Sequence, residues 1–292
     1  MHVGVRDVII QHAGYATIRE GLAALGLEAV ELALSRDLSV TGPEARLIDP
    51  RPPLTDPGRV ARAKEAFDGA GVRVGAVLLA NNFNSHHPEA ELRWVADGVR
   101  IAAGLGAGVV RLDAAMTGQQ ELPFTRRVDI YSEALGFVLD ATSDLAIPLG
   151  IENHGLQGND PAWLRAVLDK TASPRVGLTL DPANFYWSGM ALDGVYQISR
   201  RFAPDVKHVH SKNLHFSPES RDTSRRAGWD YGRHVCPLPD GDIDHGTVIS
   251  ILRAAGYDGG LYIEDESLGK YDGTERARQL GRGVEHLKTL LG

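Results

Sequence analysis

Four short segments in the second half of the chain each end an apolar run with a side chain that could bind a metal ion. In a barrel of parallel strands, the carboxyl ends of the strands meet at one mouth. One carboxylate or imidazole at each strand end could therefore form a single metal site from residues that are distant in sequence. The segments are Gly150–His154, Thr179–Asp181, His208–Lys212 and Tyr262–Glu264.

Each of these segments separates into a polar face and an apolar face. Side chains alternate between the two faces of a strand, and one face is apolar at Ile151, Leu180 and Ile263. We expect this apolar face to contact surrounding helices and the polar face to point into the barrel near its mouth. The polar set is Glu152, His154, Thr179, Asp181, His208, His210, Lys212, Tyr262 and Glu264.

Charged groups inside a barrel are costly unless they are paired or bind a metal. Two glutamates, one aspartate and one imidazole form an oxygen-rich set of donors. That set suits one divalent cation such as Mn²⁺, Mg²⁺ or Co²⁺ better than a structural zinc site, which favours thiolates. Taken singly, a strand-end glutamate could form a salt bridge, His208 could be structural, and Asp181-Pro182 could start a turn. Their occurrence on four successive strands favours a shared metal site.

The elements that must position these residues alternate regularly along the chain. Eight β-type runs each precede a stretch with the apolar spacing of a helix, which indicates parallel strands joined by crossover helices. Eight such units predict a TIM barrel. An open doubly wound sheet is the alternative, but the Gly-rich phosphate loop expected after its first strand is missing from residues 10–15.

The expected strands are His2–Ile10, Ala29–Leu34, Arg73–Ala80, Val109–Asp113, Pro148–Asn153, Val176–Asp181, Val206–His210 and Gly260–Glu264. The expected helices are Thr17–Leu25, Pro57–Ala70, Glu89–Leu105, Arg126–Leu145, Pro161–Asp169, Leu192–Phe202, His245–Ala255 and Thr274–Leu291.

The length of 292 residues fits one α/β barrel, so residues 1–292 are expected to form a single domain. Residues 214–241 carry no helical or strand pattern. An irregular stretch of this length in a compact domain is often functional. Because it follows the seventh strand, we expect it to lie as a loop over the active-site mouth.

Composition limits the partners and the location of the protein. The formal net charge is -7, which argues against a nucleic-acid surface, because such a surface needs a basic stripe. No uncharged apolar run approaches the roughly 18 residues of a membrane span, and Arg6 and Asp7 interrupt the N-terminal run, unlike a signal peptide. Cys236 is the single cysteine, so the composition fits the reducing cytoplasm. These features leave the formation of a homo-oligomer open.

The chain resembles the xylose isomerase-like TIM barrels over essentially its whole length. This group of sugar phosphate isomerases and epimerases also includes ketose 3-epimerases, hydroxypyruvate isomerase and apurinic endonucleases of the endonuclease IV type. The resemblance implies that Glu152, Asp181, His210 and Glu264 are the metal ligands and that His208 is their neighbour. The segments that carry it are Gly150–Gly155, Leu178–Asn184, His208–Lys212, Gly256–Glu264 and Gly241–Asp244.

The reaction implied by this resemblance is proton transfer next to a carbonyl. A divalent cation polarises the carbonyl and stabilises the enediolate, while Glu152 and Glu264 exchange the proton with carbon. Return of the proton to the opposite face of the same carbon gives epimerisation. Return to the neighbouring carbon gives aldose–ketose isomerisation.

Two positions depart from the pattern of the ketose 3-epimerases. Asn184 replaces a histidine and Phe216 replaces an arginine, and in those enzymes both residues contact substrate oxygens. These changes argue against a free-ketose 3-epimerase and do not affect the metal site. His154 is then a candidate acid or base, with structural support of Glu152 as its alternative role. The other candidates for substrate binding are Asn184, His208, Lys212, Arg111 and Asn82, and some of the further polar residues Asn81, Asp113 and Glu31 on earlier strands are expected to line the pocket.

The leading prediction from this resemblance is a metal-dependent isomerase or epimerase of a sugar derivative, with a small carbohydrate as the expected partner. The alternative is a lyase or dehydratase that eliminates water or an alcohol from a keto-sugar at the same site, with His154 as the acid for the leaving group. An apurinic endonuclease would need more ligands and a basic face, which the acidic composition does not favour. A barrel without catalytic activity is disfavoured by the complete set of four ligands.

Overall fold

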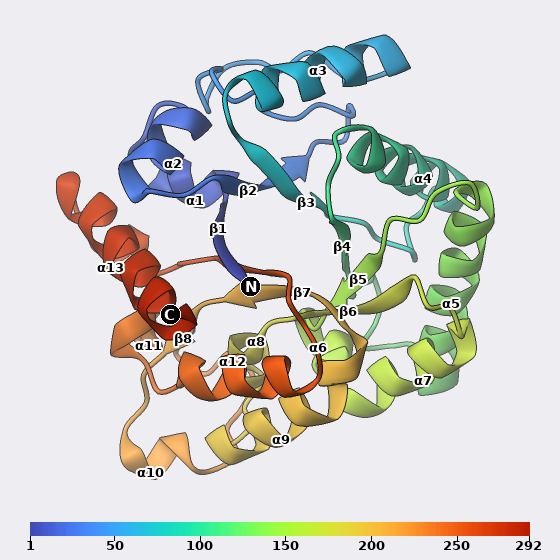
Figure 1. Ribbon diagram of the computed structural model, residues 1–292. Coiled ribbons are helices and arrows are strands. Elements are labelled where there is room, and N and C mark those ends of the chain that lie inside the picture. Colours follow the sequence, from blue (N-terminus) through green and yellow to red (C-terminus); the bar gives the residue numbers. More distant parts are fainter.

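Eight parallel strands close into a barrel in the computed structural model, which describes all 292 residues. Around the barrel the strands follow the order β1-β10-β7-β6-β5-β4-β3-β2 (Figure 1). The predicted TIM barrel is therefore confirmed, and the open doubly wound sheet is excluded. The strands are β1 (His2–Arg6), β2 (Ala29–Leu34), β3 (Arg73–Leu79), β4 (Val109–Asp113), β5 (Leu149–Glu152), β6 (Val176–Leu180), β7 (Val206–Ser211) and β10 (Gly260–Ile263).

Longer helices form a ring outside the strands (Figure 1). Several begin at a residue that caps them, because an acidic side chain accepts a hydrogen bond from an otherwise unpaired N–H group of the first turn. Asp56, Asp160 and Asp244 do this for α3, α7 and α12, respectively. The ring consists of α2 (Ile18–Leu25), α3 (Pro57–Gly69), α4 (Pro88–Gly104), α5 (Phe124–Ala141), α7 (Pro161–Thr171), α9 (Leu192–Phe202), α12 (His245–Ala254) and α13 (Thr274–Leu291).

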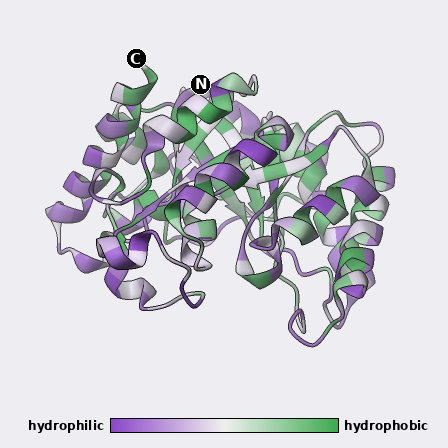
Figure 2. Cartoon of the chain, turned by 90° about the horizontal axis from the view of Figure 1, so that it is seen from below, coloured by the Kyte–Doolittle hydropathy of each residue, from purple (hydrophilic) through white to green (hydrophobic).

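The apolar core lies between the strands and this ring. Ile151, Leu178 and Ile263 are fully buried in it, as the alternation of faces predicts. Figure 2 shows the central strands as mostly hydrophobic, whereas hydrophilic and hydrophobic residues are mixed along the helices. The core therefore holds the strands in place without using the polar side chains that point into the barrel.

The lower part of the barrel interior is filled by the ring of Tyr262. Gly4, Gly75 and Gly260 on the strands around it leave space for this ring, because a Cβ atom at any of the three would collide with it. The phenol oxygen lies 3.2 Å from His2 Nε2. The barrel is thus a packed core below its mouth, as in other TIM barrels.

The first strand is shorter than the sequence predicts. We expected it to run to Ile10, but β1 ends at Arg6 and the short helix α1 (Asp7–His12) follows. The Asp7 carboxylate is buried and accepts hydrogen bonds from the N–H groups of Val8 and Ala33. These bonds end the strand, and the apolar run after Asp7 packs as a helix although its β-branched residues favour a strand.

The expectation that residues 214–241 contain no helix or strand is wrong. A two-stranded antiparallel sheet links β8 (Asn213–Leu214) to β9 (Val235–Cys236). Between them lie α10 (Pro218–Arg221) and α11 (Tyr231–His234), and the 3₁₀ turn η2 (Leu238–Asp240) follows. These elements are too short to give a periodic pattern. The same is true of the remaining short elements, which are α6 (Gly155–Gly158), α8 (Pro182–Trp187), η1 (Ala203–Asp205) and η3 (Leu268–Lys270).

None of the helices combines the length and the apolar character that crossing a lipid bilayer would require.

Candidate metal centre

Glu152, Asp181, His210 and Glu264 converge at the mouth of the barrel. Glu152 is the last residue of β5, Asp181 and Glu264 directly follow β6 and β10, and His210 lies in β7. One candidate ligand atom from each lies within 4.8 Å of the other three, and all four residues are buried. Barrel closure thus brings together the four residues that the sequence predicts as ligands. These donors could hold one cation.

The two carboxylate oxygens of Asp181 have different roles, one in capping a helix and one facing the other candidate ligands. Its Oδ1 accepts hydrogen bonds from the backbone N–H groups of Ala183, at 2.9 Å, and Asn184, at 3.2 Å, and so caps α8. Its Oδ2 is buried and accepts no hydrogen bond, although Lys212 Nζ lies 3.1 Å away. A buried carboxylate oxygen without a hydrogen bond is costly, and a cation among the four donors would satisfy it. The donor set therefore fits a divalent metal.

Three cationic side chains compensate the three ligand carboxylates. Arg111 of β4 pairs with Glu152, and Arg6 of β1 pairs with Glu264. Lys212 Nζ lies 3.1 Å from Asp181 Oδ2 and 3.2 Å from Glu264 Oε2. Buried carboxylates require such partners, because desolvation of an unpaired charge costs several kcal/mol. These pairs compensate the carboxylate charges without a cation.

These neighbours change the acidity of the ligands. Burial favours a raised pKa for Glu152, but the charges of Arg111 and His210 outweigh it and hold the pKa well below its usual range. Burial raises the pKa of Asp181 despite the opposing charge of Lys212. Burial would lower the pKa of Lys212, but the charge of Asp181 raises it, so the ammonium form is retained. Glu152 is thus present as the carboxylate that a metal ligand or a proton acceptor must be.

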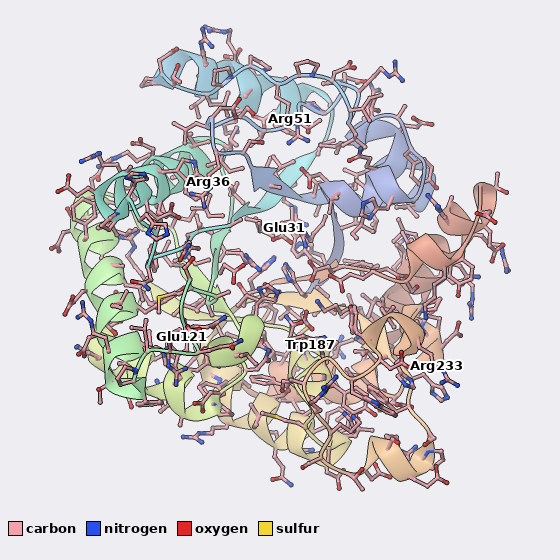
Figure 3. All side chains as sticks on the ribbon, turned by 180° about the vertical axis from the view of Figure 1, so that it is seen from behind. Glu31, Arg36, Arg51, Glu121, Trp187 and Arg233 are labelled. Carbon is pink, nitrogen blue, oxygen red and sulfur yellow. The ribbon has the colours of Figure 1, made fainter.

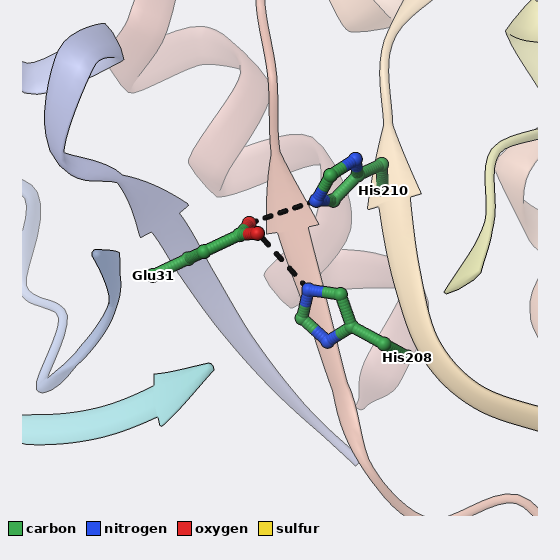
Figure 4. A group of neighbouring side chains, drawn as sticks. All are labelled: Glu31, His208 and His210. Atoms are coloured by element: carbon green, nitrogen blue, oxygen red, sulfur yellow. Dashed lines mark hydrogen bonds and ion pairs between the residues drawn. The ribbon is translucent and has the colours of Figure 1, made fainter. Parts of the chain in front are cut away.

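His210 lies between two carboxylates, one on each side of its ring. Its Nδ1 is 2.6 Å from Glu152 Oε1 and 3.4 Å from Glu264 Oε2. Its Nε2 is 2.8 Å from Glu31 Oε2 (Figure 4). Burial would lower the pKa of His210, but Glu31 and Glu152 together raise it to about 9. The Nδ1 atom faces the other candidate ligands, whereas Nε2 faces away from them.

His208 lies below His210 on the same face of β7. Its Nε2 is 3.5 Å from Glu31 Oε2 (Figure 4), and its ring centroid is 4.7 Å from that of Tyr262. Burial lowers the pKa of His208, so its imidazole is neutral near pH 7. Glu31, His208 and His210 form a second group with ligand-type atoms within 4.8 Å of one another.

His154 lies at the open side of the site and is oriented by Asp113 of β4. Its Nδ1 is 3.0 Å from Asp113 Oδ1, and nearly half of the His154 side chain is exposed. This hydrogen bond raises the pKa of His154. Asp113 also lies 3.5 Å from Arg111. An imidazole held by a carboxylate and open to solvent is a suitable arrangement for proton transfer.

The other predicted substrate residues differ in their distance from the candidate ligands. Asn184 Nδ2 lies 3.5 Å from Glu152 Oε1, and Lys212 and Arg111 contact the ligands directly. Asn82 instead bonds to Thr117 Oγ1 at 2.7 Å and contacts none of the four ligands. The structure therefore brings every predicted residue except Asn82 to the ligands or their immediate neighbours.

Among the other residues at the site, the sequence analysis missed Arg6 and gave Glu31 and Asp113 no specific role. Arg6 was missed because the first strand was expected to continue past it, so that it was not recognised as a strand end. Glu31 was expected only to line the pocket, because a single glutamate in a strand has no characteristic spacing that would identify its partners. Near the centre of the barrel, Figure 3 shows Glu31, whereas Arg51 and Arg233 lie farther out. Asp113 was expected to line the pocket because it shares a strand face with Arg111, and the structure places its carboxylate beside Arg111 and His154.

A cavity of about 280 Å³ opens beside the candidate metal centre. Its lining includes Arg6, His12, Glu264, Glu266 and Arg276. The hydroxyl of Tyr231, within the 214–241 segment, hydrogen-bonds to Glu266, which in turn lies 3.8 Å from Lys212. The elements between residues 214 and 241 thus contact the same end of the barrel as the candidate ligands.

Comparison with known proteins identifies one matching family. The model of the family described as xylose isomerase-like TIM barrel matches residues 20–290. No curated protein matches the chain in sequence.

Solved structures share the fold at low sequence identity. A protein named IolI, solved with a bound zinc atom, is 13% identical with a TM-score of 0.70 over 98% of this chain and 97% of that one. Mannonate dehydratase from Streptococcus suis is 12% identical with a TM-score of 0.67 over 99% and 93%. A 3-keto-D-glucoside 4-epimerase from E. coli is 14% identical with a TM-score of 0.66 over 99% of each chain.

Proposed function

Because this chain belongs to the xylose isomerase-like TIM barrel family, we propose that it is a divalent-metal-dependent isomerase or epimerase of a sugar derivative. A mannonate dehydratase and a 3-keto-D-glucoside 4-epimerase occur among its structural neighbours. The observation that carries the proposal is the convergence of Glu152, Asp181, His210 and Glu264 from four successive barrel strands. Each of them provides a donor to one buried point at the end of the barrel where enzymes of this fold act.

Glu152, Asp181, His210 and Glu264 would hold the cation. Three carboxylates and one imidazole favour Mn²⁺, Mg²⁺ or Co²⁺ over a structural zinc site, and the zinc of the IolI structure is a property of that protein. A bound divalent cation supplies Lewis-acid polarisation of a carbonyl oxygen and electrostatic stabilisation of the negative charge that develops next to it.

Glu152 and Glu264 are the proposed proton-transfer groups. Their carboxylates lie near the same His210 nitrogen, at 2.6 Å and 3.4 Å, and they come from different strands. A substrate carbon between them could lose a proton to one carboxylate and regain one from the other. Arg111 and Arg6 keep these carboxylates oriented, which places each acceptor before the substrate arrives.

Lys212, Asn184 and His154 are proposed to bind or protonate substrate oxygens. Lys212 provides a buried ammonium group next to two of the ligands, so it can stabilise an oxyanion. Asn184 offers an amide beside Glu152. His154 is exposed at the mouth and held by Asp113, where it can donate a proton to a departing or developing hydroxyl group.

A free-ketose 3-epimerase is a poorer match. Phe216 occupies the position of a substrate-contacting arginine in those enzymes, and its side chain is buried. Its ring packs 5.0 Å from that of Tyr186, and the guanidinium of Arg225 lies 4.2 Å above it. This side chain is used for packing, so the substrate must be recognised by other residues than in those epimerases.

Hydrogen exchange on carbon tests the proposed reaction. Candidate keto-sugars, sugar acids and their phosphates are incubated with protein and Mg²⁺ in D₂O, and deuterium incorporation is followed by proton NMR. An isomerase or epimerase incorporates deuterium at a carbon next to the carbonyl of its substrate. Failure of every candidate sugar to exchange or isomerise, with protein shown to bind the cation, would contradict the proposal.

Glu152→Gln is the variant that tests the mechanism. The amide retains the size of the side chain but cannot accept a proton, so we expect turnover to fall by about 10²–10⁴-fold. Near-ultraviolet and far-ultraviolet circular dichroism should remain unchanged. A variant with near-normal turnover would show that Glu152 is not the proton acceptor.

Elimination from a keto-sugar is the second candidate function. The His154–Asp113 pair favours it, because a protonated imidazole at the mouth could protonate a leaving hydroxyl or alkoxyl group. Proton abstraction would proceed as above, followed by loss of the β-substituent. Ultraviolet absorbance of an unsaturated keto product, together with its loss in His154→Gln, would distinguish this lyase from an isomerase.

A further inference from the structure

We propose that Glu31 is a positioning residue that holds the His210 ring so that Nδ1, and not Nε2, is offered to the divalent cation. This inference rests on the proposed metal centre and assigns to Glu31 a role that neither the sequence pattern nor the four ligands themselves require. Glu31 contributes no ligand to the cation. It acts through the imidazole that does.

The geometry places the two ring nitrogens of His210 in different surroundings. Nδ1 faces Glu152 and Glu264, which belong to the candidate ligand set. Nε2 lies 2.8 Å from Glu31 Oε2, on the opposite side of the ring (Figure 4). Without a cation, each ring nitrogen faces a carboxylate, which can only accept, so each carries a hydrogen. A cation among the four ligands would take the place of the Nδ1 hydrogen, whereas Glu31, which is outside that set, would keep the hydrogen on Nε2.

Glu31 reaches His210 across the interior of the barrel. It lies on β2, which is separated from β7 by β1 and β10 in the barrel. The β2–β3 pairing is irregular between Val30 and Glu31. The β6–β7 pairing is irregular at Lys207, the residue before His208. Irregular pairing changes the direction of side chains and is frequent near active sites. Both irregularities lie next to a member of the Glu31–His208–His210 group.

The burial of Glu31 requires an explanation that packing does not provide. The side chain is fully buried, and a buried carboxylate is costly without partners. Its Oε2 contacts the two histidines, whereas its Oε1 has no hydrogen-bond partner. An apolar side chain would fill this space at lower cost. A carboxylate is useful here because it accepts the Nε2–H and makes the imidazole a stronger ligand.

A second cation between Glu31, His208 and His210 is the competing interpretation, since their ligand-type atoms also lie close together. His210 Nε2 cannot donate its hydrogen to Glu31 and bind a cation at the same time. The two interpretations therefore predict different stoichiometries. Glu31 as a hydrogen-bond acceptor predicts one bound cation per chain, and Glu31 as a ligand predicts two.

Calorimetric titration with Mn²⁺ alone tests the role of Glu31 without any substrate. We expect one cation per wild-type chain and an affinity at least tenfold weaker in Glu31→Gln, within the 10–100-fold range that such partners of metal ligands contribute. The matched control is Glu91→Gln, because Glu91 is also buried but pairs with Arg36 away from the ligands. This control should bind Mn²⁺ as the wild type does.

The possible results separate the inference from the proposed function. Equal Mn²⁺ affinity in wild type and Glu31→Gln would overturn the role of Glu31 and leave the metal centre intact. Two cations per wild-type chain would overturn it in favour of the second-cation interpretation. No binding to wild type would overturn the metal centre and the inference together.

A measurement on the wild-type protein covers the case in which Glu31→Gln does not fold. In ¹⁵N-labelled protein loaded with Zn²⁺, long-range ¹H–¹⁵N correlation spectra distinguish a protonated ring nitrogen from one without hydrogen. The His210 signals are assigned by their loss in His210→Gln. We expect a protonated Nε2 and an Nδ1 without hydrogen, and the reverse pattern would overturn the inference.

Discussion

At the scale of single residues, the candidate metal centre consists of carboxylates that each have a cationic partner within the protein. Arg111 and Arg6 pair with Glu152 and Glu264, and Lys212 lies between Asp181 and Glu264. Such pairs contribute little net stability, but breaking one leaves an uncompensated buried charge. The stability of the metal-free protein should therefore depend on these cations.

Arg111→Met tests this dependence. The Arg111 side chain is only 6% exposed and that of Glu152 only 2%. Removing the arginine leaves the Glu152 carboxylate without its main partner, so the free energy of unfolding should fall by about 3–5 kcal/mol. Urea unfolding of metal-free protein measures the loss, and the double variant Arg111→Met/Glu152→Gln should recover part of it.

Arg100→Met is the control for this measurement. Arg100 pairs with Asp144 at 3.1 Å, and the two side chains are 48% and 63% exposed. Solvent screens such a pair, so its loss should cost less than about 1 kcal/mol. Equal effects of the two arginine substitutions would contradict the importance of burial at Arg111.

At the scale of elements, the ends of the strands and the starts of the helices share the same residues. Asp181 caps α8 with one oxygen and faces the candidate ligands with the other. Asp7 ends β1 and starts α1, which leaves Arg6 at the mouth beside Glu264. The local hydrogen bonds that terminate an element thus also place the side chains of the site.

Helix α12 contains a histidine that should make stability depend on pH. His245 is buried in its first turn, with its Nδ1 unpaired. Burial, together with the nearby His286, lowers the pKa of His245 to about 4, although Asp244 opposes this change. An unfolded histidine titrates near pH 6.5, so between these values the unfolded chain binds more protons. The contribution of this group to stability should be complete above pH 6.5 and fall by roughly 3 kcal/mol as the pH decreases to 4.

His245→Phe is the variant that isolates this effect. The ring is retained but cannot take up a proton, so the free energy of unfolding should decrease less steeply between pH 6.5 and 4 than in wild type. Urea denaturation at a series of pH values measures both curves. Parallel curves for the two proteins would rule out His245 as the group responsible.

At the scale of the whole molecule, barrel closure creates the site. β1 pairs with β10, so the N-terminal strand lies beside the last one and Arg6 meets Glu264. Candidate ligands from β5, β6, β7 and β10 can share one cation only because these strands are consecutive in the closed sheet. A cation bound there would link four strands, and it should stabilise the complete fold.

Addition and removal of the cation test this connection. A ligand that binds only the folded state at 100 times its Kd adds about 2.7 kcal/mol to the free energy of unfolding. We therefore expect Mn²⁺ to raise Tm by several degrees in differential scanning calorimetry, and EDTA to reverse the change. Asp181→Asn keeps the oxygen that caps α8 and weakens the site, so its Tm should respond much less. A full response in Asp181→Asn would show that the cation binds elsewhere.

Sequence patterns were sufficient for features that depend on nearest neighbours along the chain. The alternation of strands and helices predicted the barrel, and the parity of residues in each strand separated Glu152 from Ile151 and His210 from Val209. These predictions succeed because successive side chains in a strand point to opposite faces, so the order of residues in the strand decides which face each one takes. The short helices α6 and α8 could not be predicted in the same way, since helices of four and six residues are too short to show a period.

Such patterns could not predict contacts between distant segments, because these contacts depend on how the barrel closes. Nothing near Glu31 in the sequence indicates that its carboxylate meets His208 and His210 in the barrel interior. The pairing of Arg6 with Glu264 likewise follows from the end of β1 at Asp7 and from the contact of β1 with β10. Local residue order thus specified which groups could bind a cation, whereas tertiary packing specified their partners, since hydrogen bonds and charges act between atoms that are close in space.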